Sequence, residues 1–236
     1  MAEVLKRLLP IFLFVVCCLP AWAAADEPGE ESVAATPPAA EDPARHVVLT
    51  VAPSYAWLLD GDTADLLGPI YGGTVALRYC PWKHLSAEIG VGYLIGYEKL
   101  DHEFAYVRYT RLTNSTFTPF YAAVNFEMRP QATVNPYVGL AAGGLYLTFH
   151  QAPEDVDSDI PLDKDELSIT EQHTLPLLAG KAGLDVRLTE NVGFFAEATY
   201  RYTGAITYDL RIPRAKDETE LVADHLAGAL GIAVYY

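Results

Sequence analysis

Residues 85–97, LSAEIGVGYLIGY, alternate between two kinds of side chain with a period of two. The odd-numbered positions are apolar and the even-numbered positions are small or charged, with Leu94 as the exception. Successive side chains of a β-strand point to opposite faces, so this stretch predicts a strand with one apolar and one polar face. Its apolar face is Leu85, Ala87, Ile89, Val91, Tyr93, Ile95 and Tyr97.

The same alternation recurs in seven further stretches, which makes eight predicted strands between residue 46 and residue 236. Residues 104–111 also alternate, and we interpret them as an external extension of the neighbouring hairpin rather than as a ninth spanning strand. The other seven apolar faces are Val47, Leu49, Val51, Tyr55, Trp57; Tyr71, Val75, Leu77, Tyr79; Phe120, Ala122, Val124, Phe126, Met128; Val138, Leu140, Ala142, Tyr146; Leu178, Ala182, Leu184, Val186, Leu188; Val192, Phe194, Ala196, Ala198, Tyr200, Tyr202; and Leu226, Leu230, Ile232, Val234, Tyr236.

The connections between these stretches alternate between short and long. Transmembrane β-barrels have short turns on the periplasmic side, long loops outside and an even number of strands. The sequence therefore predicts an all-β protein, an eight-stranded antiparallel up-and-down transmembrane β-barrel. The short connections are residues 80–84, 130–135 and 189–191, and the long ones are residues 58–69, 98–115, 150–174 and 203–224.

A soluble β-sandwich also alternates, but its polar face carries many unconstrained charges. Here the polar face is mainly Gly, Ala, Ser and Thr with isolated charges of nearly balanced sign. A balance of charge suits a closed lumen, because an unpaired buried charge costs several kcal/mol. We therefore expect a structural ion-pair network in the lumen. Room for its long side chains is left by the glycines at 90, 92, 139, 143, 183 and 231. The nine inward charges are Arg78, Glu88, Glu127, Arg129, Lys181, Asp185, Arg187, Glu197 and Arg201.

Aromatic residues of the apolar face gather towards the two ends of the predicted strands. Two such bands are typical of the girdles at the two interfaces of a lipid-embedded barrel. Near the long loops lie Tyr55, Trp57, Tyr71, Tyr93, Tyr97, Tyr146 and Tyr202, and at the turn end lie Tyr79, Trp82 and Tyr236.

The N-terminal part predicts export and then a segment without a core. Residues 1–25 have a basic start, an apolar run and a small-residue cleavage site before Asp26, which indicates a signal peptide rather than a retained anchor. Residues 26–45 consist mainly of Ala, Pro and acids, which predicts a disordered leader, and the barrel domain covers residues 46–236. After cleavage only Cys80 remains, so no intramolecular disulfide is expected.

The net charge of −15 disfavours nucleic acid as a partner, because phosphate binding needs clustered Lys and Arg. The acids concentrate in the leader and in residues 150–174, which we expect to be solvated. With this barrel architecture we expect outer-membrane lipid around the strands and a monomer.

The chain resembles the small outer-membrane barrel family that includes the OmpA transmembrane domain, over about residues 47–236. The resemblance rests on residues 135–143 (NPYVGLAAG), 182–191 (AGLDVRLTEN) and 197–202 (EATYRY), and on the closing run to Tyr236. It implies location in a Gram-negative outer membrane and recognition of Ile232, Val234 and Tyr236 by the barrel-assembly machinery during biogenesis. No peptidoglycan-binding domain is implied.

The sequence gives little support to catalysis or to a bound cofactor. A lipid-modifying barrel enzyme would need a lipid-facing His and Ser; His150 is suitably placed, but no serine follows closely. Residues 155–166 place acids at five positions of a Ca²⁺ loop, yet Ile160 stands where the turn needs Gly, which favours a plain acidic loop. We therefore expect no catalytic, cofactor-binding or metal-binding residues.

The predicted role is structural or concerned with surface recognition, carried by the four long external loops on a rigid scaffold. A narrow pore is the alternative, and a lipid-modifying enzyme is less favoured.

Overall fold

The computed structural model describes residues 47–236 apart from 105–106, 131, 159–167 and 213–214. The predicted signal peptide and leader lie outside the described residues. No helix in the described part of the chain is long and apolar enough to cross a membrane.

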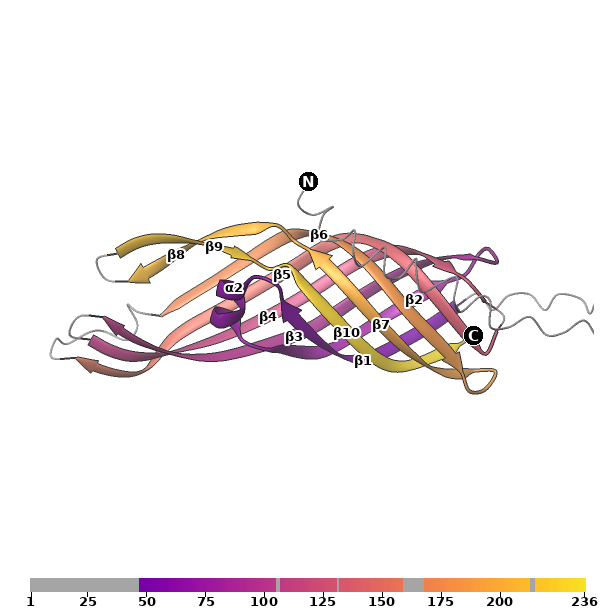
Figure 1. Ribbon diagram of the computed structural model, residues 1–236, viewed down its shortest axis with the longest axis horizontal. Helices are drawn as coiled ribbons and strands as arrows, with labels where there is room; N and C mark the ends of the chain where they lie inside the picture. Colours follow the sequence, from indigo (N-terminus) through magenta and orange to yellow (C-terminus); the bar gives the residue numbers. More distant parts are fainter. Residues whose placement is uncertain (1–46, 105–106, 131, 159–167, 213–214) are drawn as a thin grey trace, which may run out of the picture. The chain divides into compact units, whose positions relative to one another are not determined.

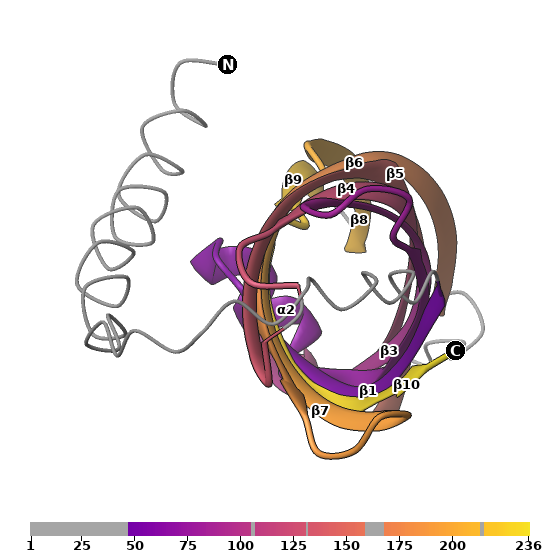
Figure 2. The ribbon, with the colours of Figure 1, turned by 90° about the vertical axis from the view of Figure 1, so that its right-hand side faces the viewer.

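Eight antiparallel strands close into a barrel in the order β1-β10-β7-β6-β5-β4-β3-β2, as Figures 1 and 2 show. This confirms the predicted fold class. The elements are β1 (Val47–Leu58), α2 (Gly61–Leu67), β2 (Ile70–Tyr79), β3 (Leu85–Phe104), β4 (Val107–Glu127), β5 (Val134–Ser158), β6 (Ile169–Arg187), β7 (Val192–Tyr202), β8 (Ala205–Ile212), β9 (Ala215–Val222) and β10 (His225–Tyr235).

The first and last strands complete the barrel. β1 pairs with β10 from Val48↔Tyr235 to Leu58↔His225, and the Tyr236 backbone N–H donates to the Val47 carbonyl at 3.0 Å. Closure removes the unpaired strand edges that a sheet would otherwise expose, which is what a span through hydrocarbon requires.

The side-chain alternation follows the prediction. Ile89, Val91 and Leu140 are 62, 49 and 74% exposed on the outer wall, whereas Glu88 and Lys181 on the inner wall are 4 and 5% exposed. The predicted aromatic bands are also on the outer wall, because Tyr93 of β3 and Tyr79 of β2, one from each band, are 60 and 49% exposed.

The short connections are turns, as predicted, but the long connections are largely regular structure rather than loops. β3, β4, β5 and β6 continue past the other strands as a paired extension at one end of the barrel, with Glu98↔Thr113 and Gln151↔Ile169 still in register (Figure 1). Residues 104 and 107–111 belong to this extension, which confirms that they do not form a ninth span. The physical reason is that the period-two pattern continues through these segments, so the ladder hydrogen bonds continue too.

The first and fourth long connections also differ from the loops we expected. Residues 61–67 form the short helix α2, which Asp60 caps by accepting the Thr63 backbone N–H at 2.9 Å, and Gly68 ends it at φ 68°. The fourth connection contains the separate hairpin β8-β9, whose β9 donates from the Val222 N–H to the Thr63 hydroxyl at 3.1 Å. An N-cap Asp and a left-handed Gly are the sequence signals for such a helix.

Candidate functional site

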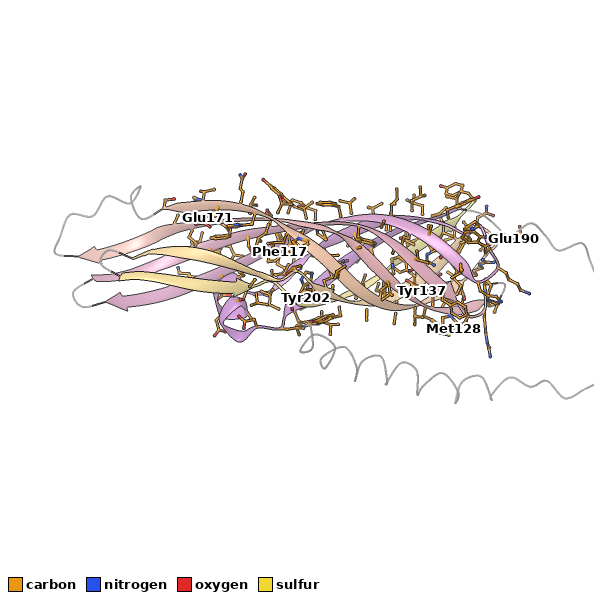
Figure 3. All side chains as sticks on the ribbon, turned by 90° about the horizontal axis from the view of Figure 1, so that it is seen from above. Phe117, Met128, Tyr137, Glu171, Glu190 and Tyr202 are labelled. Atoms are coloured by element: carbon orange, nitrogen blue, oxygen red, sulfur yellow. The ribbon has the colours of Figure 1, made fainter. Side chains whose placement is uncertain are left out.

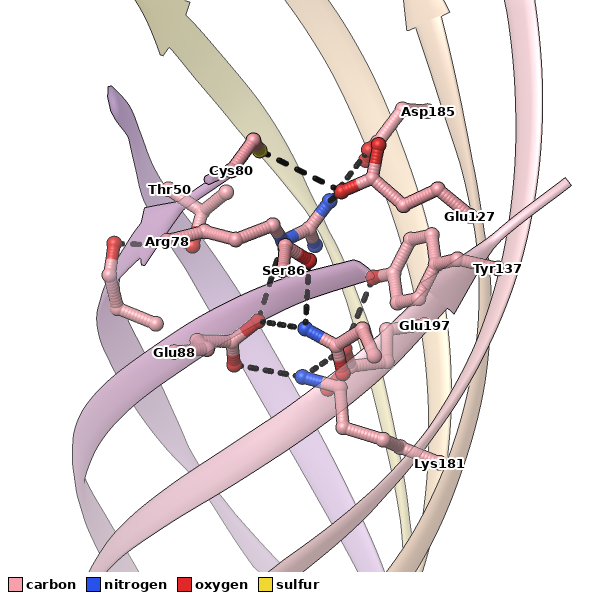
Figure 4. Close-up of polar contacts among 12 residues, drawn as sticks. Thr50, Arg78, Cys80, Ser86, Glu88, Glu127, Tyr137, Lys181, Asp185 and Glu197 are labelled. Atoms are coloured by element: carbon pink, nitrogen blue, oxygen red, sulfur yellow. Dashed lines mark hydrogen bonds and ion pairs between the residues drawn. The ribbon is translucent and has the colours of Figure 1, made fainter. Parts of the chain in front are cut away.

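The lumen holds a connected network of six charged side chains from five strands, drawn in Figure 4. Arg78 of β2 pairs with Asp185 at 2.6 Å, Glu88 at 3.2 Å and Glu127 at 3.9 Å. Lys181 of β6 pairs with Glu88 at 2.6 Å and with Glu197 at 2.7 Å. Glu88 therefore joins the two cations into one network, as the sequence predicted for the inward face.

Neutral side chains donate to further oxygens of Glu88, Glu127 and Glu197, whereas Asp185 Oδ1 is buried without a hydrogen-bond partner among the described residues. Asn125 donates to Glu88 at 3.0 Å, Asn135 to Glu127 at 3.1 Å and Tyr137 to Glu197 at 2.8 Å. The Arg78 guanidinium also lies over the Tyr137 ring, 4.3 Å from its centroid. Sequence reasoning missed these partners, although their inward position in the alternation of β4 and β5 could have identified them.

Three of the nine predicted inward charges lie outside this network. Arg187 donates to the Pro130 carbonyl at 3.1 Å and lies over the Tyr235 ring, while Arg201 hydrogen-bonds to His225 at 3.3 Å. Arg129 donates its backbone N–H to the Asn135 side chain. These ion pairs therefore join two basic and four acidic side chains, and the three other predicted inward charges are all basic.

The inward glycines make room for other groups than we expected. A Cβ on Gly90 would lie 2.4 Å from the Tyr121 ring, and one on Gly183 would lie 2.4 Å from the Tyr137 ring. These glycines stand directly opposite those tyrosines in the strand register. They therefore accommodate aromatic rings rather than crossing Arg and Glu side chains.

The lumen beyond the network, towards the extension, is filled by apolar side chains. Phe117 of β4, Leu94 of β3 and Leu147 of β5 point inward and have no exposed surface. Leu67 of α2 joins the same cluster, so the short helix packs against the inner apolar residues at this end. Figure 3 shows Phe117 nearer the extension and Tyr137 of the polar layer nearer the turns. Leu94, the exception in the alternation of residues 85–97, is therefore part of this inner apolar cluster.

Of the residues that we weighed for catalysis and calcium binding, the structure places His150 and the backbone of the first part of the acidic segment. His150 of β5 is exposed on the outer wall of the extension and hydrogen-bonds to the Thr170 hydroxyl at 2.8 Å. Residues 155–158 belong to β5, and the rest of the acidic segment as far as residue 166 lies outside the described residues. Within the described part of the chain, no group of three or more His, Cys, Asp or Glu side chains is arranged to hold a metal ion.

No family model and no curated protein matches the chain. Solved structures do. The outer membrane protein OprG from Pseudomonas aeruginosa is 14% identical with a TM-score of 0.54, and the match covers 82% of this chain and 96% of OprG. Neisserial surface protein A is 14% identical with a TM-score of 0.41, covering 81% and 96%. The outer membrane protease OmpT from Escherichia coli is 6% identical with a TM-score of 0.38, covering 84% and 99%.

The class of protein is thus defined by its fold: a small, closed, eight-stranded barrel of the outer-membrane type. The likeness to OprG concerns the fold alone at this identity.

Proposed function

We propose that this protein lies in the outer membrane of a Gram-negative bacterium and recognises a ligand or surface outside the cell through the end of the barrel that carries the extension. The observation that supports this most is the paired extension of β3, β4, β5 and β6. A sheet continuous with a closed barrel holds its side chains in a fixed geometry, which favours binding because little order has to be created.

The character of the extension also supports binding rather than transport. Its outer face places Asn114, His150 and Thr170 in one row across three strands, since these residues are partners in register. The next row is Thr116, Thr148 and Gln172. Hydrogen-bonding side chains on a rigid, solvated sheet are suited to recognition.

A narrow pore is disfavoured by the filled lumen. Leu94, Phe117 and Leu147 have no water-accessible surface, and below them Arg78 and Lys181 are only 2 and 5% exposed. An apolar plug and a buried ion-pair layer in series leave no wide aqueous path.

The proposal is tested by a variant that combines a shortened extension with alanine at the two polar rows that the deletions retain, which are Asn114, His150, Thr170, Thr116, Thr148 and Gln172. Deleting residues 99–112 and 152–168 leaves Glu98 opposite Thr113 and Gln151 opposite Ile169, so Asn-Gly turns can join each pair without a change of register. Cells that express the wild type are expected to be retained on one or more surfaces coated with defined polysaccharides, matrix proteins or lipids. Cells that express the shortened barrel should not be.

The control is heat modifiability of both proteins in the outer-membrane fraction, which shows that the shortened barrel still folds. Equal retention of the two strains on every surface would count against the extension as the binding part. A wild-type protein absent from the outer-membrane fraction would count against the location.

A further inference from the structure

A cavity of about 450 Å³ lies beside the outer end of β1, away from the lumen network. Three elements form it: the end of β1, the helix α2 with its C-cap, and β3, which contributes Glu98. Its lining residues are Tyr55, Ala56, Trp57, Leu58, Ala64, Asp65, Gly68, Pro69 and Glu98.

Two carboxylates from different elements face this cavity, Asp65 from α2 and Glu98 from β3. No lysine or arginine lines it, and neither carboxylate forms an ion pair with any described residue. Gly68 has a positive φ of 68°, and a Cβ there would lie 2.5 Å from Glu98 Oε2. The chain thus turns tightly against the Glu98 carboxylate, which leaves a negatively charged site with no counter-ion among the residues that the structure describes.

Two aromatic rings complete the wall. Tyr55 and Trp57 are in edge-to-face contact with ring centroids 4.6 Å apart, and they are 38 and 51% exposed. A cation near the face of a Trp or Tyr ring is attracted by the ring quadrupole. Both rings belong to the outer aromatic band, so this wall lies at the level where lipid head groups meet water.

The combination of groups selects among ligands. An anion finds no basic partner in the cavity, and a hydrocarbon would bury two carboxylates without compensation. A small metal ion would make no use of the aromatic wall, because hard cations take oxygen ligands. An organic ammonium group suits both the acidic and the aromatic side of the cavity, because its charge can lie near the carboxylates and its C–H surface against the rings.

We infer that this cavity binds an organic ammonium group, supplied either by the head group of an outer-leaflet lipid or by a free amine. The inference rests on the proposed function in placing this end of the barrel outside the cell. The binding site itself is separate from the residues removed in the shortened-extension variant, which keeps both Asp65 and Glu98.

The fluorescence of Trp57 reports on the site directly. The chain has three tryptophans, of which Trp22 precedes the predicted cleavage site, so a Trp82→Phe variant of the mature protein has Trp57 as its single tryptophan and can be excited selectively above the tyrosine absorption band. This protein is folded into phosphatidylglycerol vesicles and titrated with tetramethylammonium chloride, with sodium chloride at equal ionic strength as the reference. We expect a saturable change that sodium chloride does not produce.

Glu98→Gln and Asp65→Asn should each weaken this response by about tenfold, because each removes one charged partner of the ammonium group. The matched control is Glu190→Gln, which removes the same charge at the opposite end of the barrel, where Figure 3 shows Glu190. Heat modifiability of each variant shows whether it folds. If one carboxylate variant does not fold, the other still tests the inference.

Three results would overturn the inference: an equal response to sodium chloride, an unchanged response in both carboxylate variants, or a response to calcium chloride at lower concentration that the same variants abolish.

Adding phosphatidylethanolamine to the vesicles distinguishes the two sources of the ammonium group. A shift of the titration to higher tetramethylammonium concentration identifies the lipid head group, and an unshifted titration identifies a free amine. Loss of cell retention in the shortened variant with intact amine binding separates this site from the proposed recognition surface.

Discussion

Arg78 is the residue on which the lumen network depends, because its single guanidinium contacts Glu88, Glu127 and Asp185. Arg78→Met keeps an unbranched apolar stem and removes the guanidinium group, so the buried carboxylates of Glu127 and Asp185 lose their cation. We expect the free energy of unfolding to fall by about 3–5 kcal/mol, as for other broken buried ion pairs. Urea unfolding in lipid vesicles measures it.

Lys83→Met is the matched control for Arg78, since Lys83 is an exposed cation in the turn between β2 and β3. It should change stability by less than about 0.5 kcal/mol. Equal effects of the two substitutions would mean that the network contributes nothing beyond its net charge.

Cys80, which follows the last residue of β2, gives a pH-dependent prediction. Burial, and then the nearby Glu127 carboxylate, raise the pKa of the Cys80 thiol to about 12. The thiolate is the reactive form, so alkylation of folded protein by iodoacetamide should accelerate about tenfold per pH unit and continue to rise above pH ~9.5. In the urea-unfolded chain the rate should level off near the ordinary thiol pKa of about 8.5.

Mass spectrometry of the mature protein follows this reaction, because Cys80 is then its single cysteine if cleavage occurs before Asp26. The raised pKa of the Cys80 thiol also makes stability depend on pH. The protonated thiol stabilises the folded state below the pKa of the unfolded chain, and this stabilisation is lost as the pH rises towards 12. A folded-state rate that levels off together with the unfolded rate would contradict the shift.

At the scale of the strand, glycine and tyrosine act as cross-strand pairs. Gly183 of β6 stands opposite Tyr137 of β5, and a Cβ on Gly183 would meet the tyrosine ring at 2.4 Å. Gly183→Ala should therefore displace Tyr137, whose hydroxyl donates to Glu197, and cost about 1–3 kcal/mol. Gly180→Ala, on the same strand with nothing within 4 Å of the new Cβ, is the control and should be near neutral in the same unfolding assay.

The strand alternation was predictable from the sequence, because it depends on neighbours two residues apart, and so were the three short turns. The long connections were not, since whether a polar segment pairs as a strand depends on partners far along the chain. Thr113 illustrates this: it is fully buried and accepts a hydrogen bond from Gln151, a residue of another strand. The cross-strand pairs of tyrosine and glycine could not be predicted either, because the register between strands is set only when the barrel closes.

The extension makes a prediction of its own about exchange of backbone amides. Residues 113–118 and 145–151 belong to paired strands of the extension and the adjoining barrel, so their amides should exchange slowly with deuterium. Mass spectrometry of peptides from the folded protein in detergent measures this. Rates close to those of the unfolded chain at residues 113–115 and 150–151 would indicate the open loops that the sequence predicted for residues 98–115 and 150–174.

At the scale of the whole molecule, the lumen is divided into layers along its length. A small cluster around Val48, Phe195 and Tyr235 lies on the turn side, the ion-pair network follows, and the apolar cluster around Phe117 fills the end near α2. Of these layers, the sequence indicated the middle one, because isolated charges among small residues are conspicuous. The apolar layer was missed, since in a barrel an inward apolar residue such as Leu94 looks like an error in the pattern.

This layering predicts that the folded barrel does not conduct ions. The apolar cluster excludes water at Leu94, Phe117 and Leu147, and the network fixes Arg78 and Lys181 across the lumen beneath it. In planar bilayers we therefore expect no discrete current steps from wild-type protein, while a porin in the same membrane provides the positive control. Phe117→Ala should also stay silent, because the ion-pair layer still blocks the path in series. Current steps from wild-type protein that is shown to be folded by heat modifiability would favour the pore instead, and steps that appear in Phe117→Ala alone would identify the apolar cluster as the single barrier.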